Sequence, residues 1–152
     1  MTAGPDVEYD RSVIGKQVEV GSVTVTREMI AEYCRAIGER NPLYTDDEAA
    51  KRGPHGGIVA PPAILLRMRF ELGLDPKVKF GNVTFHAGER LESFEPVRPG
   101  DTLTAYGQAK DVYEKTGRSG RMVFVVRRLD YRNQHGRLIA AIENSILHRE
   151  IG

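Results

Sequence analysis

The sequence predicts an α+β domain in which one antiparallel sheet curls around a single central helix. Apolar residues recur at helical spacing early in the chain, whereas segments from residue 82 onward have the character of strands. The short turn Asn-Gln-His-Gly at residues 133–136 makes its flanking strands antiparallel. Because helices precede the strands and do not alternate with them, α+β architecture is indicated. Strands are expected at residues 82–86, 89–95, 102–111, 121–133 and 137–148.

The elements before the central helix are a strand and two helices. Residues 13–25 are predicted to form a short strand region, followed by a helix that Thr26 caps and Gly38 ends. The apolar residues of this helix fall on one face. A second, short helix is expected at residues 46–52. The turn at residues 41–45 therefore lies between two helices, where side chains can point into a cleft.

The central helix is predicted to begin at the two prolines 61–62, which suit a helix start. Residues 63–72 carry apolar side chains on nearly every side, as expected for a helix wrapped by a sheet. Arg67 and Arg69 are unexpected there, because an unpaired buried guanidinium is costly. Glu71 follows Arg67 by four residues and is expected to pair with it.

Length and composition fit one domain with one hydrophobic core. The chain has 152 residues, of which 40% are hydrophobic and 28% charged. Residues 1–11 are polar and are expected to form a flexible N-terminal arm, and residues 12–152 a single domain. The net charge of +1 leaves no basic excess to neutralise a run of phosphates, so nucleic acid is not an expected partner.

Metal binding, disulfide bonding and membrane insertion are not expected. Cys34 is the only cysteine, and the four histidines lack the paired spacing of metal ligands. Residues 1–10 lack the apolar segment of a signal peptide, and no apolar run of about eighteen residues could cross a membrane. The expected location is the reducing cytoplasm.

Two segments carry the candidate chemistry. Residues 38–44 read Gly-Glu-Arg-Asn-Pro-Leu-Tyr, and residues 56–62 read Gly-Gly-Ile-Val-Ala-Pro-Pro. The first resembles the Gly-Asp-x-Asn-Pro-Leu-His motif of MaoC-type (R)-specific enoyl-CoA hydratases, and the second the Ile-Ala-His-Gly segment that opens their central helix. The turn Val-Arg-Pro-Gly-Asp-Thr-Leu at residues 97–103 is also similar to the family's. The resemblance spans residues 13–150 and implies a single hot-dog fold.

The resemblance also implies an altered active site. Glu39 stands where the family has a catalytic Asp, Tyr44 where it has a His, and Pro62 where a Gly N–H binds the thioester oxygen. Proline has no backbone N–H, and such a donor is typically worth about 3 kcal/mol in the transition state. Tyrosine, with an ordinary pKa of about 10 against about 6.5 for imidazole, is a poor proton acceptor at neutral pH. The longer side chain of glutamate displaces the carboxylate by about 1 Å, which can cost about 10²-fold in rate.

These departures resemble the N-terminal half-domain of MaoC dehydratases and the accessory subunits of two-subunit (3R)-hydroxyacyl dehydratases. The resemblance implies a non-catalytic subunit of a hydro-lyase, which shapes the acyl pocket for a catalytic partner in a heterodimer or a dimer of heterodimers. Two alternatives stay open. One is a self-sufficient homodimeric enoyl-CoA hydratase that uses Glu39, with an amide near Gly57 or Ala60 as oxyanion donor. The other is a non-enzymatic acyl-thioester binding protein.

The resemblance implies an acyl-CoA or acyl-carrier-protein thioester as ligand, with no further cofactor. The acyl group can be fatty, branched or sterol-derived, and the sequence does not distinguish these. Leu65 and Met68 are expected to form the floor of the acyl tunnel. Against these roles, Glu39 and His55 could be solvated, Asn41 could fix a turn and Tyr44 could pack. The predicted substrate-binding residues are Asn41, Leu43, Tyr44, His55, Gly57, Ile58, Leu65 and Met68. Candidates for the phosphates of coenzyme A are Lys115, Arg118 and Arg121, in a basic loop that could equally be solvated.

Overall fold

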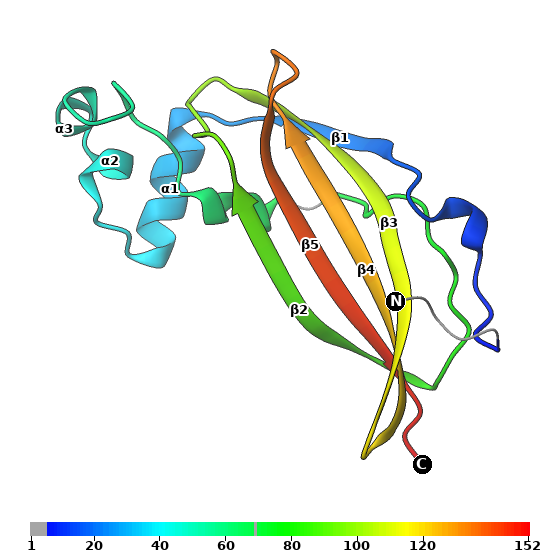
Figure 1. Cartoon of the computed structure of the whole chain (residues 1–152). Coiled ribbons are helices and arrows are strands. Elements are labelled where there is room, and N and C mark those ends of the chain that lie inside the picture. The colour runs from blue at the N-terminus through cyan, green and yellow to red at the C-terminus, as the bar shows by residue number, and fades with distance from the viewer. Residues whose placement is uncertain (1–5, 69) are drawn as a thin grey trace.

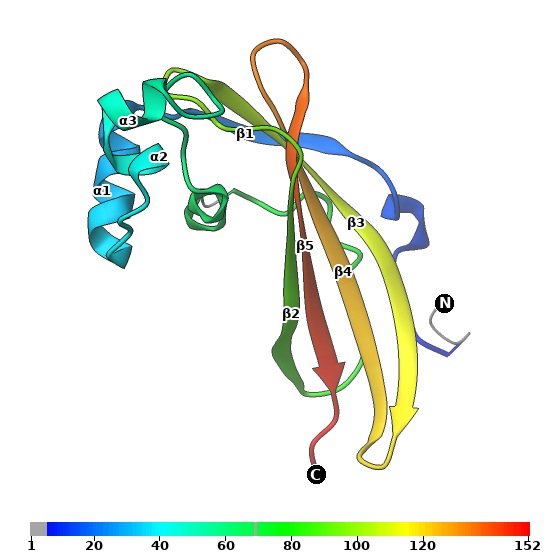
Figure 2. The same ribbon diagram turned by 60° about the vertical axis from the view of Figure 1, so that its left-hand side comes forward.

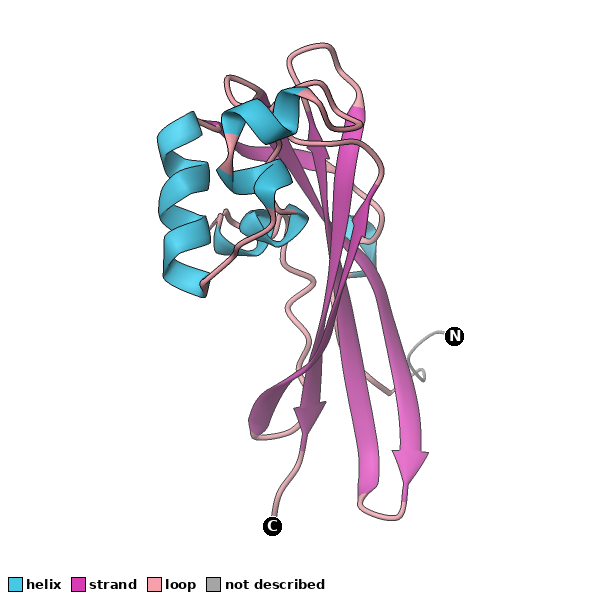
Figure 3. Ribbon diagram, turned by 90° about the vertical axis from the view of Figure 1, so that its left-hand side faces the viewer, coloured by secondary structure: helices cyan, strands magenta, loops and turns pink. Residues whose placement is uncertain are grey.

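The computed structural model describes residues 6–68 and 70–152, which form one five-stranded antiparallel sheet with helices on one face (Figure 1; Figure 3). The strand order is β1-β3-β4-β5-β2, so that β1 and β2 are the edge strands. The α-helices gather toward one end of the sheet, and the long strands extend well past them (Figure 2). The strands are β1 (Val18–Thr24), β2 (Val83–Ser93), β3 (Thr102–Gly117), β4 (Gly120–Arg132) and β5 (Leu138–Arg149).

The predicted first helix is confirmed as α1, Arg27–Ile37. The Thr26 side chain accepts the N–H of Met29, and Gly38 ends the helix in the left-handed region at φ 70°. The expected turn at 41–45 contains a single helical turn, α2 (Pro42–Thr45), and the second predicted helix is α3 (Asp47–Lys51). No helix within the described residues is long and apolar enough to span a membrane.

The predicted central helix is wrong in kind and in length. The chain forms a 3-10 helix, η2, over Pro62–Arg67, and Met68 leaves helical conformation at ψ 116°. The chain must then reach Gly73, which adopts φ +87° and packs on the backbone of Gly107 in β3. A continuous helix through residue 72 would prevent this contact. The i+4 geometry between Arg67 and Glu71 is lost, and no ion pair joins them; Arg69 lies outside the described residues.

The strand predictions need three changes. The strand expected at 102–111 continues to Gly117 as β3, past a register shift between Ala109 and Asp111. The strand region expected at 13–25 begins only at β1, because Arg11–Val13 form a short 3-10 helix, η1. The two strands expected at 82–86 and 89–95 are one strand, β2, with a register shift between His86 and Gly88. The sequence around this shift predicts a gap between two strands, although the pairing with β5 continues on both sides of it.

The described part of the predicted flexible arm is packed on the sheet. Val7 is 1% exposed, in a small apolar cluster with Val112, Val123 and Val125. Glu8 forms a bridge with Lys79, where the Lys79 N–H donates to the Glu8 carbonyl at 2.9 Å. Residues 6–11 are therefore an arm held by its own domain, and residues 1–5 lie outside the described residues.

The main core lies between the helices and the inner face of the sheet. It combines Ile30 and Cys34 of α1 with Leu65 of η2 and with Leu103 and Tyr131 of the strands. All five are at most 3% exposed. This arrangement seats the segment after η2 directly above the inner face of β4 and β5.

Gly73→Ala is expected to lower the free energy of unfolding by about 2 kcal/mol. A Cβ at this position would lie 2.7 Å from the backbone carbonyl of Gly107, and the positive φ adds strain. Gly88→Ala is the matched control, because an added Cβ there meets nothing within 4 Å. Urea unfolding of both variants measures the difference, and equal midpoints would contradict the close approach.

Candidate functional site

The segment 38–44 uses its polar side chains to hold its own backbone. Glu39 is half-buried, and its Oε1 accepts the N–H groups of Arg40 and Asn41, both at 2.9 Å. The Asn41 Oδ1 in turn accepts the N–H of Leu43 at 3.0 Å, as N-cap of α2. In this structure both side chains stabilise the turn, which matches the structural role considered for Asn41.

Beside this turn lies a small cavity of about 300 Å³ at the end of α1. Glu39, Tyr44 and the buried Cys34 are among the residues that line it. Burial raises the pKa of the Cys34 thiol, and the charge of Glu39 raises it further. Tyr44 is half-buried and packs against the main core, so its ring has the packing role considered from the sequence.

Backbone hydrogen bonds join the three segments that resemble the MaoC-type motifs, residues 38–44, 56–62 and 97–103. The N–H of Val59 donates to the carbonyl of Leu43 at 3.3 Å, and that of Ala60 to the carbonyl of Val97 at 2.8 Å. Arg98 extends the connection, since its Nη1 donates to the carbonyl of His55 at 2.7 Å. The Ala60 amide is therefore engaged and is not available as an oxyanion donor.

The second segment is mostly core. Ile58 is 6% exposed and belongs to the main hydrophobic cluster. Gly57 and His55 are half-buried in the loop before it. Pro62 occupies the first position of η2, where the resembling family supplies an N–H and proline has none.

A cavity of about 340 Å³ lies between the segment that follows η2 and the inner face of the sheet. Both residues predicted to floor the acyl tunnel, Leu65 and Met68, line it. We call it the inner cavity. Its lining residues are Leu65, Leu66, Met68, Phe70, Leu72, Glu89, Arg127, Leu129, Tyr131, Ile142 and Asn144.

Polar atoms stand in this largely apolar lining. The Tyr131 hydroxyl and the Asn144 Oδ1 are buried and have no hydrogen-bond partner among the residues that the structure describes. Burial, followed by the charge of Glu89, raises the pKa of Tyr131 to about 12. Asn144 Nδ2 lies 3.2 Å from His86 Nδ1, and Arg127 pairs with Asp75 at 3.0 Å. Single residues spaced along strands give no sequence motif, and sequence reasoning missed this group.

A third cavity, of about 750 Å³, lies on the other side of the segment that follows η2, against α1 and β1. Met68 and Phe70 line both this cavity and the inner cavity and form the wall between them. The Phe70 ring lies where Gly21 of β1 has no side chain, and a Cβ there would come within 2.5 Å of the ring. The ring also lies near Tyr131, with 6.2 Å between centroids.

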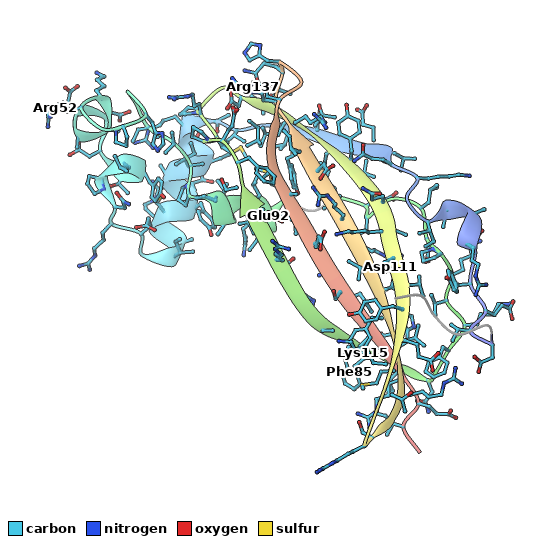
Figure 4. The ribbon with its side chains drawn as sticks, in the orientation of Figure 1. Arg52, Phe85, Glu92, Asp111, Lys115 and Arg137 are labelled. Carbon is cyan, nitrogen blue, oxygen red and sulfur yellow. The ribbon has the colours of Figure 1, made fainter. Side chains whose placement is uncertain are left out.

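The three candidate phosphate ligands sit at the β3–β4 hairpin, at the end of the sheet away from the helices. Figure 4 shows Lys115 there and Arg52, the C-cap residue of α3, at the opposite end. Arg121 pairs with Glu114 and with Asp6, both at 2.7 Å. Lys115 Nζ lies over the rings of Tyr113 and Phe124, 5.6 and 5.8 Å from their centroids. Arg118 is exposed in the turn.

One chain therefore does not join the basic hairpin to the 38–44 segment in a single site. A thioester that used both would have to extend along the sheet or be bound by two chains. The described residues also contain no cluster of His, Cys, Asp and Glu that could hold a metal ion.

Known proteins resemble this chain in sequence. A family model described as FAS1-like, dehydratase domain region, matches residues 12–142. The UPF0336 protein SCO4636 of Streptomyces coelicolor is 32% identical over 119 residues, which cover 71% of this chain and 76% of that protein. The 3-oxo-4,17-pregnadiene-20-carboxyl-CoA hydratase alpha subunit of Mycobacterium tuberculosis is 54% identical over 41 residues, 27% of this chain and 13% of that protein.

Solved structures share the fold. The MaoC-like dehydratase from Rhodospirillum rubrum has a TM-score of 0.70 at 20% identity, over 91% of this chain and 94% of that one. The C-terminally truncated HadBC complex, a (3R)-hydroxyacyl-ACP dehydratase from Mycobacterium tuberculosis, gives 0.70 at 25% identity over 91% and 98%. The ChsH1–ChsH2 complex from the same organism gives 0.70 at 24% identity over 91% and 85%.

Tyr131→Phe is expected to raise the free energy of unfolding at pH 7 by about 1 kcal/mol, because it removes an unpaired buried hydroxyl and keeps the ring. The pKa of Tyr131 is about 12 in the folded chain against about 10 in an unfolded one. Ionisation of this hydroxyl therefore favours the unfolded chain, so the free energy of unfolding of the wild type is constant with respect to this group below pH about 10 and declines as the pH rises toward about 12. Urea unfolding at pH 7 to 11.5 should show that this decline is smaller in the variant. Parallel pH profiles would contradict the assignment.

Proposed function

Because this chain belongs to the FAS1-like dehydratase domain region family and has the hot-dog fold of MaoC-like dehydratases and hydratases, we propose that it is the accessory subunit of a two-chain enzyme. The enzyme is an (R)-specific enoyl-thioester hydratase or 3-hydroxyacyl dehydratase. This chain shapes the pocket for the acyl group, and a second hot-dog chain supplies the Asp, the His and the oxyanion donor. The thioester of coenzyme A or of an acyl carrier protein is the ligand, and no other cofactor is needed.

The observation that carries the proposal is the state of the three altered positions. The Glu39 carboxylate accepts two backbone N–H groups of its own turn, and Tyr44 packs against the core. Pro62 offers no N–H to an oxyanion, and the nearby Ala60 amide already donates to Val97. The scaffold of the site is kept, while the groups that would move a proton or hold a negative charge are replaced or occupied.

The inner cavity supports the binding role. It is lined mainly by apolar side chains and has the size of a small ligand pocket. Leu65 and Met68 belong to it, as expected for an acyl tunnel floor. Water then adds across the double bond at the partner's catalytic groups, and this chain contributes binding energy and orientation.

The two-chain arrangement is supported by the relatives and by the sheet. The HadBC and ChsH1–ChsH2 structures are complexes of two kinds of chain, and the hydratase relative is an alpha subunit. Within this chain β2 is an edge strand, and an exposed edge can pair with a strand of another chain. Its exposed residues include Phe85, 47% exposed (Figure 4).

The first expected outcome is that the purified chain alone does not hydrate trans-2-enoyl-CoA, measured as loss of enoyl absorbance. A copurifying hot-dog chain that carries the Asp and the His should restore the reaction. In the complex, Glu39→Gln should change the rate less than about twofold, because glutamine keeps the acceptor oxygen of the turn and a catalytic carboxylate is worth about 10²-fold or more.

Other outcomes would favour other functions. Turnover by the chain alone that disappears in Glu39→Gln would mean that Glu39 is the catalytic base of a self-sufficient hydratase. Stabilisation by acyl-CoA without turnover, in every combination of chains, would indicate a binding protein.

The second expected outcome concerns acyl length. Met68→Trp, which adds bulk to the wall of the inner cavity, should lower kcat/KM of the complex for long enoyl-CoA substrates by about tenfold or more and leave short ones unchanged. Phe94→Trp is the matched control, since Phe94 is 50% exposed and lines neither cavity. An unchanged length profile in Met68→Trp would remove the inner cavity from the acyl site.

A further inference from the structure

The inner cavity contains more hydrogen-bonding capacity than a plain hydrocarbon chain can use. Tyr131 is fully buried, and its hydroxyl has no partner in the described part of the chain. The Asn144 Oδ1 is likewise buried and unpaired. Buried polar atoms in proteins are nearly always paired, and an exception beside a cavity points to a group that enters it. Both residues line this cavity.

We propose that the inner cavity accepts an acyl group that carries a neutral oxygen function, a hydroxyl or a ketone, on an otherwise apolar skeleton. This inference rests on the proposed function for the thioester end of the ligand. The polar atoms themselves belong to the folded chain, whatever its catalytic role.

The two side chains select for oxygen in different ways. A phenol donates through its O–H, so Tyr131 can serve a ketone or a hydroxyl. Asn144 Nδ2 lies against His86, which directs the unpaired Oδ1 to accept from a ligand donor. A hydroxyl can accept from Tyr131 or donate to Asn144, whereas a ketone can only accept from Tyr131. The cavity therefore favours hydroxyl over ketone, and ketone over a bare hydrocarbon.

The charges around the cavity exclude an acidic ligand group. The Glu89 carboxylate lines the same cavity and repels an anion. Among the described lining residues Arg127 is the positively charged one, and it is already paired with Asp75 at 3.0 Å and bonded to the carbonyl of Leu74 at 3.3 Å. A carboxylate at the end of the acyl chain is thus disfavoured, although it also carries oxygen.

The rest of the lining requires a hydrophobic skeleton. Leu65, Phe70, Leu129 and Ile142 face the same space from both sides of the cavity. Burial of apolar ligand surface against them supplies most of the affinity, and the oxygen function supplies selectivity. A short polar molecule without such a skeleton would gain little there.

The test uses saturated probes, which bind without reacting, and calorimetric titration of the full chain in complex with its catalytic partner. The probes are decanoyl-CoA, 10-hydroxydecanoyl-CoA, 9-oxodecanoyl-CoA and decanedioyl-CoA. The hydroxyl probe should bind about tenfold more tightly than decanoyl-CoA, the factor expected for one net hydrogen bond. The diacid should bind more weakly than decanoyl-CoA.

Variants separate selectivity from folding. Tyr131→Phe preserves the ring and its packing. In this variant the affinity of the hydroxyl probe relative to decanoyl-CoA should fall, because only Asn144 can still bind the hydroxyl. The ketone probe should bind no more tightly than decanoyl-CoA. Asn144→Leu should abolish the preference for hydroxyl over ketone. Tyr106→Phe is the matched control, because Tyr106 lies opposite Asp130 on the outer face of the sheet and should leave all ratios unchanged.

Equal affinities for decanoyl-CoA and 10-hydroxydecanoyl-CoA in the wild type, or an unchanged ratio in Tyr131→Phe, would overturn the inference while leaving the proposed function intact. Failure of every acyl-CoA to bind would count against the proposed function instead. The cavity is then tested with cyclohexanol and methylcyclohexane, by NMR of the Leu65 and Met68 methyl groups. Shifts with cyclohexanol that weaken in Tyr131→Phe support the inference, and their absence overturns it.

Discussion

The contact between Gly73 and Gly107 is the constraint on which the centre of this fold depends. A Cβ at either position would come within 3 Å of the other segment's backbone, so only two glycines allow the chain to lie this close to the sheet. The contact pins one end of the segment after η2, and the prolines at 61 and 62 fix the other. Between these two anchors the segment spans the inner face of β4 and β5 without filling the space beneath it, and the inner cavity is what remains.

Main-chain hydrogen bonds hold the candidate active-site region together. The segments around residues 40, 59 and 98 are joined mainly through backbone carbonyls and N–H groups, which depend little on side-chain identity. The links between these segments therefore do not involve the side chains at positions 39, 44 and 62. Glu39 has a structural role within its own turn, since its side chain accepts two N–H groups there.

Elements defined by local rules could be predicted from the sequence. The cap at Thr26, the stop at Gly38 and the turn closed by Asn133 and Gly136 depend on residues close in sequence, and each was found where expected. The early end of η2 could not be predicted, because the chain beyond it packs at Gly73 on Gly107, 34 positions later, and such a long-range contact leaves no local signal in the sequence. The family and the fold could be predicted from the motifs. The placement of Tyr131 and Asn144 on one face of the sheet could not, because it depends on strand pairing, which leaves no motif in the sequence.

Met68 and Phe70 form the wall between the inner cavity and the cavity against α1 and β1, so the sizes of these two cavities depend on each other. Both lie against the same side chains, so a displacement of the wall that lengthens one shortens the other. Phe70 rests against Gly21, where β1 presents bare backbone, and the ring cannot move further that way. The backbone of β1 at Gly21 therefore limits how far this wall can move away from the inner cavity.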